Sequence, residues 1–98
     1  MPVTNDRQSC ALAAGLDVVG DLWGLLVIRE LLVAPANEDE LLDGVPGLDR
    51  DLLRERLDRL CAAAVVERRR REYCLTPHGR RLHGPLVMLA EWGRRHPG

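Results

Sequence analysis

The chain has 98 residues, the size of one domain, and its 46% hydrophobic and 30% charged residues are typical of a folded protein rather than a disordered one. Its fourteen basic residues are all arginine. Residues 1–51 carry ten acids against three arginines, whereas residues 52–98 carry five acids against eleven. The net charge of −1 is unlike that of most nucleic-acid-binding proteins, but the separation of charge predicts that a polyanion binds the C-terminal half.

The N-terminal sequence favours neither export nor insertion into a membrane. Residues 1–10 are polar and lack the apolar core of a signal peptide, and the longest apolar run, Leu22–Ile28, is too short to span a bilayer. Three separated cysteines in a sequence with no signal-peptide pattern indicate reduced thiols. We therefore expect a cytoplasmic protein without membrane contact, a single domain over residues 1–98 in which residues 1–9 form a flexible arm.

The first two predicted elements are apolar helices. Apolar residues recur at helical spacing over Cys10–Val19, and Gly20 ends that helix. The next helix, Leu22–Val33, is apolar nearly all round, and Pro35 ends it. A helix without a polar face is typical of a buried position, so we expect Leu22–Val33 to form the centre of the fold.

Two further helices are predicted on either side of a tight turn. Asn37 and Glu40 have the spacing of a capping box at the start of a short helix over Glu38–Val45. A turn containing Pro46–Gly47 follows, and Asp49 caps a longer helix. The apolar stripe of that longer helix consists of Leu48, Leu52, Leu53, Leu57, Leu60 and Cys61. Two helices joined in this way are typical of a helix-turn-helix.

The C-terminal part is predicted to be a β-hairpin and one more helix. Val65–Val66 begins a strand, Tyr73–Leu75 is its partner, and Glu67–Glu72 is the expected connection. The pair Thr76–Pro77 caps and opens a final helix, which we expect Pro85 to kink. The resulting order of four helices, two strands and a helix is mainly α with a small hairpin, which is the order of a winged helix-turn-helix.

Several stretches between residues 10 and 93 carry motifs in a recognisable order. They are Cys10-Ala11-Leu12 with Val19-Gly20-Asp21-Leu22-Trp23, Leu26-Val27-Ile28-Arg29-Glu30-Leu31, Glu40-Leu41 with Pro46-Gly47-Leu48, Leu53-x-x-Arg56-Leu57-x-x-Leu60, and Tyr73-x-Leu75-Thr76-x-x-Gly79-x-x-Leu82 with Trp92-Gly93. The ordered set resembles the HxlR family, a branch of the MarR-like transcription regulators. The resemblance implies a homodimeric bacterial regulator of a palindromic operator, in which the helix from Arg50 enters the major groove and the hairpin contacts the adjacent backbone.

Four stretches of the sequence depart from the pattern of that family. Asn37-Glu38 stands where members usually carry a basic or aromatic pair, Asp49-Arg50-Asp51 where the recognition helix often begins with Ser or Thr, and Ala64 where Gly is usual. The hairpin has no Gly, Asn or Pro and carries Arg68–Arg71 instead. Because carboxylates repel phosphates, a second hypothesis stays open. It is a winged-helix dimer repurposed to bind or transform a small molecule, or to bind a protein, with DNA binding weakened or lost.

The candidate contacts to double-stranded DNA are arginines of the recognition helix and the hairpin. They are Arg50, Arg54, Arg59, Arg68, Arg69, Arg70 and Arg71. Arg50 and Arg54 lie one turn apart on the outer face of the helix, and arginine can pair with guanine edges. Pairing with Asp51, Glu55 or Asp58 on the same helix is an equally favoured alternative.

Three further residues are candidates for sensing. Cys10 matches an N-terminal cysteine that acts as a redox sensor in some similar regulators, and the alternative is an inert thiol. Trp23 and Trp92 are candidates for a pocket that binds a flat effector in the dimer, and the alternative is packing in the core. The acids Glu38, Asp39, Glu40 and Asp43 are interpreted as a solvated face.

The sequence predicts neither an enzyme nor a bound metal or cofactor. The three histidines show no ligand spacing with one another or with the cysteines, and no nucleophile–base set or phosphate-binding loop is present. Dimerisation is expected through the terminal helices, which carry more apolar surface than a monomer of this length needs. The residues expected in that interface are Leu12, Leu16, Leu86, Leu89 and Trp92.

Overall fold

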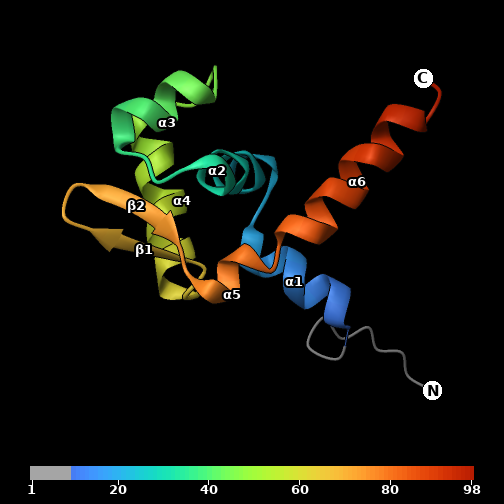
Figure 1. The fold of residues 1–98 in the computed structure, drawn as a ribbon, viewed down its shortest axis with the longest axis horizontal. Coiled ribbons are helices and arrows are strands. Elements are labelled where there is room, and N and C mark those ends of the chain that lie inside the picture. Colours follow the sequence, from blue (N-terminus) through green and yellow to red (C-terminus); the bar gives the residue numbers. More distant parts are fainter. Residues whose placement is uncertain (1–9) are drawn as a thin grey trace.

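The fold is a winged helix-turn-helix, mainly helical with one antiparallel hairpin (Figure 1). The computed structural model describes residues 10–98, and the flexible arm expected at residues 1–9 lies outside them. The elements are α1 (Ala11–Val19), α2 (Leu22–Val33), α3 (Glu38–Gly44), α4 (Arg50–Ala62), β1 (Val66–Arg69), β2 (Glu72–Leu75), α5 (Pro77–Arg80) and α6 (His83–Arg95). The predicted fold class is therefore confirmed.

Helix α2 forms the centre of the core, as its all-round apolar sequence predicts. Val27 and Ile28 are fully buried, and α2 packs against α3, α4 and β2. The apolar stripe of α4 faces α2, with Leu53 and Leu57 buried between the helices. The opposite, charged face of α4 is thereby turned to solvent, which is the orientation that a recognition helix needs.

Local capping fixes where both helices of the helix-turn-helix begin. The Asn37 side chain accepts a hydrogen bond from the Glu40 backbone N–H at 2.8 Å, and the Glu40 carboxylate accepts one from the Asn37 N–H at 2.9 Å. Asp49 accepts a hydrogen bond from the Leu52 N–H at 2.8 Å and so caps α4. These contacts satisfy backbone donors that a helix leaves unpaired at its start, and they confirm both predicted caps.

The hairpin is longer than predicted. Arg69 lies opposite Glu72, so the connection is only Arg70–Arg71, and the prediction that all of Glu67–Glu72 connects the strands is wrong. The strands extend because long charged side chains can lie on the solvent face of a strand while Tyr73 is buried. Arg70 has a φ of 59° and takes the left-handed conformation that tight turns usually assign to Gly or Asn.

The residue just before α3's N-cap forms a β-bridge with the hairpin. Ala36 and Tyr73 exchange two backbone hydrogen bonds, Ala36 N–H to Tyr73 O at 3.0 Å and Tyr73 N–H to Ala36 O at 2.8 Å. Ala36 precedes the Asn37 cap directly. The bridge therefore sets the hairpin beside the first turn of α3.

The C-terminal part contains two helices instead of one kinked helix. The chain leaves α5 at Arg81–Leu82 and α6 begins at His83, so the prediction of a kink at Pro85 is wrong. Pro85 occupies the third position of α6. A backbone N–H at that position has no acceptor within the helix, so proline, which lacks the N–H, loses no hydrogen bond there. Helix α6 buries none of its residues and projects from the rest of the fold, with α1 beside its base (Figure 1).

No single helix among residues 10–98 is long and apolar enough to cross a bilayer. By length and composition, α1 and α2 meet that test only as a pair bent by 77°.

Candidate nucleic-acid interface

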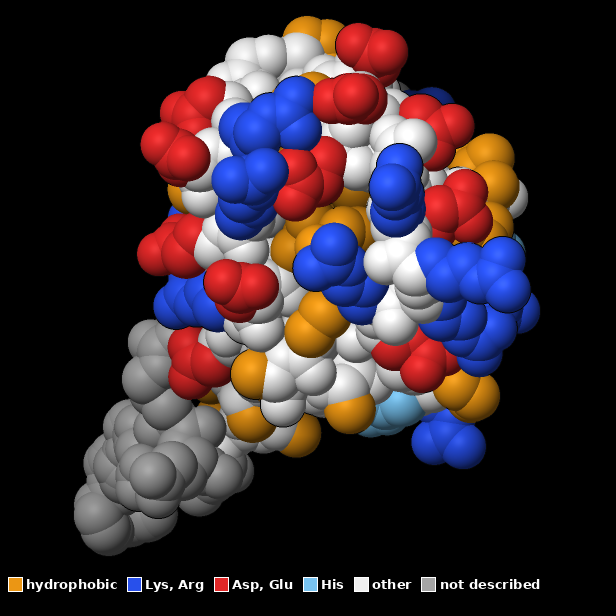
Figure 2. Space-filling view, turned by 90° about the vertical axis from the view of Figure 1, so that its left-hand side faces the viewer, with side chains coloured by type: hydrophobic (Ala, Val, Ile, Leu, Met, Phe, Trp, Pro, Cys, Tyr) orange, Lys and Arg blue, Asp and Glu red, His pale blue; other side chains and the backbone are white. Residues whose placement is uncertain are grey.

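The exposed face of α4 and the hairpin share one side of the molecule, and charge is mixed across it (Figure 2). Arginines gather at the hairpin, while arginines and acids alternate over α3 and α4. Between these two regions lies a shallow polar groove of about 360 Å³. Its lining residues are Asn37, Glu38, Asp39, Arg50, Arg54, Arg68, Arg71 and Tyr73.

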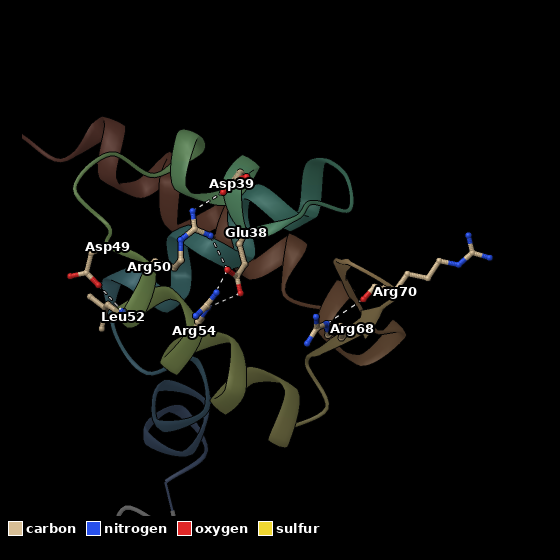
Figure 3. Close-up of polar contacts among 8 residues, drawn as sticks. All are labelled: Glu38, Asp39, Asp49, Arg50, Leu52, Arg54, Arg68 and Arg70. Atoms are coloured by element: carbon tan, nitrogen blue, oxygen red, sulfur yellow. Dashed lines mark hydrogen bonds and ion pairs between the residues drawn. The ribbon is translucent and has the colours of Figure 1, made fainter.

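Two of the four arginines of α4, Arg50 and Arg54, pair with acids of α3 (Figure 3). Arg50 donates from Nη1 to Glu38 Oε1 at 2.9 Å and from Nη2 to Asp39 Oδ1 at 2.6 Å. Arg54 donates from Nε to both carboxylate oxygens of Glu38, at 3.1 and 3.0 Å. The partners are thus on the neighbouring helix, and the alternative of pairing within α4 is wrong, because packing places the first turn of α3 over these side chains.

These contacts revise the interpretation of a solvated face for Glu38 alone, since Asp39, Glu40 and Asp43 are exposed as predicted. Glu38 lies between two guanidinium groups, and its side chain is only 22% exposed. The hydrogen bond from Arg54, followed by that from Arg50, holds the pKa of Glu38 below its usual range. The carboxylate therefore stays ionised and paired at neutral pH.

The hairpin arginines fall into two groups. Arg68 donates to the Arg70 carbonyl at 3.2 Å and lies over the Tyr73 ring at 5.7 Å, and Arg69 pairs with Glu67 at 2.8 Å. Arg70 and Arg71 are exposed, and neither forms an ion pair with any residue that the structure describes. Their charge is the part of the hairpin that remains available to an anion.

Arg59 lies away from this groove. Its guanidinium is near the α1–α2 junction, where Arg59 Nη1 lies 3.8 Å from the position that a Cβ would take on Gly20. Of the seven predicted arginines, four line this groove and three do not: Arg50, Arg54, Arg68 and Arg71 line it, whereas Arg59, Arg69 and Arg70 lie outside it.

Arg56 and Asp21 form an ion pair that the sequence analysis missed. Arg56 donates from Nε to Asp21 Oδ1 at 3.0 Å and from Nη2 to Oδ2 at 2.5 Å, and a further contact joins Arg56 to Glu55. Asp21 also caps α2 by accepting from the Gly24 N–H at 3.0 Å. Mainly through the Arg56 hydrogen bond, the pKa of Asp21 is lowered to about 2. The sequence did contain one signal for this contact. Arg56 lies three residues after Leu53, on the apolar side of α4, where a charged side chain faces another element of the fold instead of solvent.

The candidate sensing residues lie apart from one another. Cys10 is exposed directly before α1. Trp23 is half-buried beside Gly47, whereas Trp92 is exposed on α6 and stacks on His96 with ring centroids 4.7 Å apart. The groove beside Trp92 is lined by residues of α6 and the chain end, so one chain does not bring the two indoles into that groove.

The remaining thiols lie nearer the core. Cys74 is buried and Cys61 is half-buried, and burial raises the pKa of the Cys61 thiol. Among residues 10–98, no group of three or more histidine, cysteine or acidic side chains is arranged to hold a metal ion.

An unpartnered apolar surface runs along α6. One groove of about 450 Å³ lies between α2 and α6, and a second of about 350 Å³ lies between α1 and α6. Leu12 is 73% exposed, Leu89 57% and Trp92 62%, whereas Leu86 is half-buried. Exposed apolar surface of this extent is typical of an interaction site.

Comparison with known proteins identifies the family. Residues 18–97 match the model of the HxlR-like helix-turn-helix family. The chain is 29% identical to the HTH-type transcriptional regulator YtcD of Bacillus subtilis, over 92% of this chain and 77% of that protein.

Solved structures of regulators have the same fold. Quinone-bound YodB from B. subtilis superposes with a TM-score of 0.81 at 26% identity, over 87% of this chain and 97% of that one. The redox regulator HypR in its oxidised form gives 0.82 at 25%, over 91% and 99%. These findings favour a DNA-binding regulator over a repurposed module. The chain belongs to the HxlR-like helix-turn-helix family of transcription regulators.

Proposed function

We propose that this regulator binds duplex DNA as a homodimer, with α4 of each protomer in a major groove and each hairpin on the adjacent backbone. The observation that carries the proposal is that arginines of α4 and of the hairpin lie on the same face of the molecule. Arg54 of α4 and Arg71 of the hairpin border the same groove, and Arg70 extends from the hairpin tip (Figures 2 and 3). The bound operator would then be palindromic, because a two-fold protein reads two equal half-sites.

Within this interface the hairpin supplies most of the contact to phosphate. The charges of Arg50 and Arg54 are largely balanced by Glu38 and Asp39, whereas Arg70 and Arg71 carry no such partner in the described structure. Affinity that depends on phosphate contacts falls steeply with salt, because bound counterions are released.

The test is fluorescence anisotropy with a duplex from upstream of the protein's own coding sequence, measured over a range of salt. We expect a log–log slope of about −0.9 for each phosphate neutralised, and a shallower slope for the Arg70→Ala/Arg71→Ala variant. Arg80→Ala/Arg81→Ala removes the same charge from the exposed α5 region and should leave the slope unchanged. No binding of the wild type at low salt would refute the proposal.

The dimer is proposed to form through α1 and α6. Helix α6 has no buried residue in the single chain, and Leu12, Leu16, Leu89 and Trp92 are all more than half exposed. A 98-residue chain has a small core, so covering this surface with a second copy would add apolar burial that the monomer lacks.

Cys10 is proposed to make the dimer responsive to oxidants. Its thiol is exposed beside α1, and the similar structures include a redox regulator and a quinone-bound regulator. Oxidant followed by non-reducing electrophoresis should give a covalent dimer that Cys10→Ser abolishes, while Cys61→Ser retains it. We further propose a cytoplasmic location.

An effector pocket that includes Trp23 and Trp92 is also proposed in the dimer, and quenching of indole emission by a bound effector would report it.

A further inference from the structure

The acidic first turn of α3 holds Arg50 and Arg54 of α4 in different ways (Figure 3). Arg50 uses both terminal nitrogens on protein acids, Nη1 on Glu38 and Nη2 on Asp39. Arg54 uses only Nε, which donates to both oxygens of Glu38. Within residues 10–98, the two terminal nitrogens of Arg54 have no hydrogen-bond partner.

This difference favours Arg54 over Arg50 as the arginine that reads a base. Guanine presents two acceptors, O6 and N7, on its major-groove edge, and a guanidinium with two free N–H groups can bond both. Arg54 keeps such a pair and its side chain is 58% exposed. Each terminal nitrogen of Arg50 already donates one of its two N–H groups to an acid of α3, which ties that side chain to the protein.

Glu38 restrains the Arg54 side chain. The Glu38 side chain is 22% exposed and is itself held by Arg50, so it forms a fixed support on one edge of the Arg54 guanidinium. A long side chain that is ordered before binding loses less conformational entropy on binding. Glu38 and Asp39 together balance the charges of Arg50 and Arg54, so this cluster is close to neutral and the carboxylate need not exclude DNA from this surface.

We propose that Glu38 is a positioning residue that orients Arg54 toward a guanine in the major groove, and that Arg50 holds Glu38 instead of reading DNA. This inference rests on the proposed DNA binding and assigns roles within that interface. It accounts for an acid at the position where the family usually carries a basic or aromatic residue. Glu38 lowers affinity for DNA in general and raises the preference for one base pair.

The experiment begins with selection of preferred duplexes by the wild-type protein from a randomised pool. Affinity is then measured for the selected duplex, for duplexes with each guanine replaced in turn, and for an unrelated duplex. Glu38→Gln should bind the unrelated duplex more tightly, because a negative charge is lost. The same variant should lose about 10- to 100-fold of the preference for guanine at one position, which is the size of one bidentate contact.

Matched variants separate positioning from charge. Asp43→Asn removes an exposed acid of the same helix that has no ion pair among the described residues, and it should leave the base preference unchanged. Arg54→Lys keeps the charge but loses the fork, so it should lose the guanine preference as Glu38→Gln does. Arg50→Lys can still pair with Glu38 and should retain most of that preference.

Three results would overturn the inference. If Glu38→Gln binds all duplexes more tightly with an unchanged base preference, Glu38 only blocks DNA. If Arg50→Lys and Arg54→Lys lose the preference equally, the division of roles is wrong, and this comparison decides the matter even if Glu38→Gln does not fold. If the wild type binds no duplex, the proposed function fails and this inference fails with it.

Discussion

Ala64 occupies a backbone conformation that costs an L-residue free energy. It has a φ of 61° and follows α4, where the Val65 N–H bonds the Leu60 carbonyl at 2.9 Å and the Ala64 N–H bonds the Cys61 carbonyl at 3.0 Å. This pair of bonds is the Schellman motif, in which glycine is usual at the left-handed position. The departure at Ala64 noted in the sequence is therefore a structural cost.

Replacing Ala64 with glycine should stabilise the protein by about 1 kcal/mol, because glycine adopts the left-handed region without a Cβ clash. Urea unfolding at a fixed protein concentration measures this as a higher midpoint. Ala63→Gly is the control, since Ala63 has a φ of −87° and glycine gains nothing there. A lower midpoint for Ala64→Gly would contradict the strain argument.

The Asp21–Arg56 pair joins the start of α2 to the middle of α4. Because the folded-state pKa of Asp21 is lowered from 3.8 to about 2, its contribution to stability is present above pH 3.8 and is lost as the pH falls toward 2. The pair thus fixes the recognition helix against the central helix at neutral pH.

Two substitutions at Asp21 separate its roles. Asp21→Asn keeps a capping acceptor but loses the ion pair, so at pH 7 it should lose up to about 1 kcal/mol, a modest value because the pair is partly exposed. Asp21→Ala also removes the side-chain acceptor that caps α2, so it should lose roughly 1 kcal/mol more. The difference between wild type and Asp21→Asn, measured by urea unfolding, should shrink as the pH falls from 4 toward 2. Asp58→Asn on the exposed face of α4 should show no such trend, and a constant difference for Asp21→Asn would argue against the pair.

At the scale of the molecule, the apolar surface of α1 and α6 predicts a dimer. Light scattering at micromolar concentration should give twice the chain mass of 11.0 kDa. Leu89→Asp places a charge in this surface and should yield the monomer, whereas Leu89→Met keeps the surface apolar and should retain the dimer. A monomeric wild type would exclude this interface.

Folding also redistributes the charge that the sequence separates into two halves. Glu38 belongs to the acidic half, yet packing pairs it with Arg54 of the basic half, on the face proposed to bind DNA. The face in Figure 2 is therefore mixed in charge, and its free positive charge is concentrated at the hairpin. A net charge summed over segments does not describe such a surface.

The sequence by itself determined the fold class, the order of the elements as far as β2 and the starts of several helices. The signals for these features are local: the Asn37–Glu40 capping box, the Asp49 cap and the apolar spacing of α4 each act within a few residues. The same locality explains the mistakes. The kink expected at Pro85 and the long hairpin connection were judged from residue types alone, whereas the start of α6 and the strand pairing set both.

Only the tertiary structure decided which charges meet. Glu38 and Arg54 are 16 residues apart, and Asp21 and Arg56 are 35 apart. Sequence spacing identifies only partners three or four residues apart on one helix, so the only acids that it offered to Arg50 and Arg54 were those of α4. The actual partners depend on how α2 and α3 pack against α4, because an ion pair requires atoms within a few ångströms. For the same reason, only the fold could show that both terminal nitrogens of Arg54 are free while each terminal nitrogen of Arg50 already donates to an acid of α3.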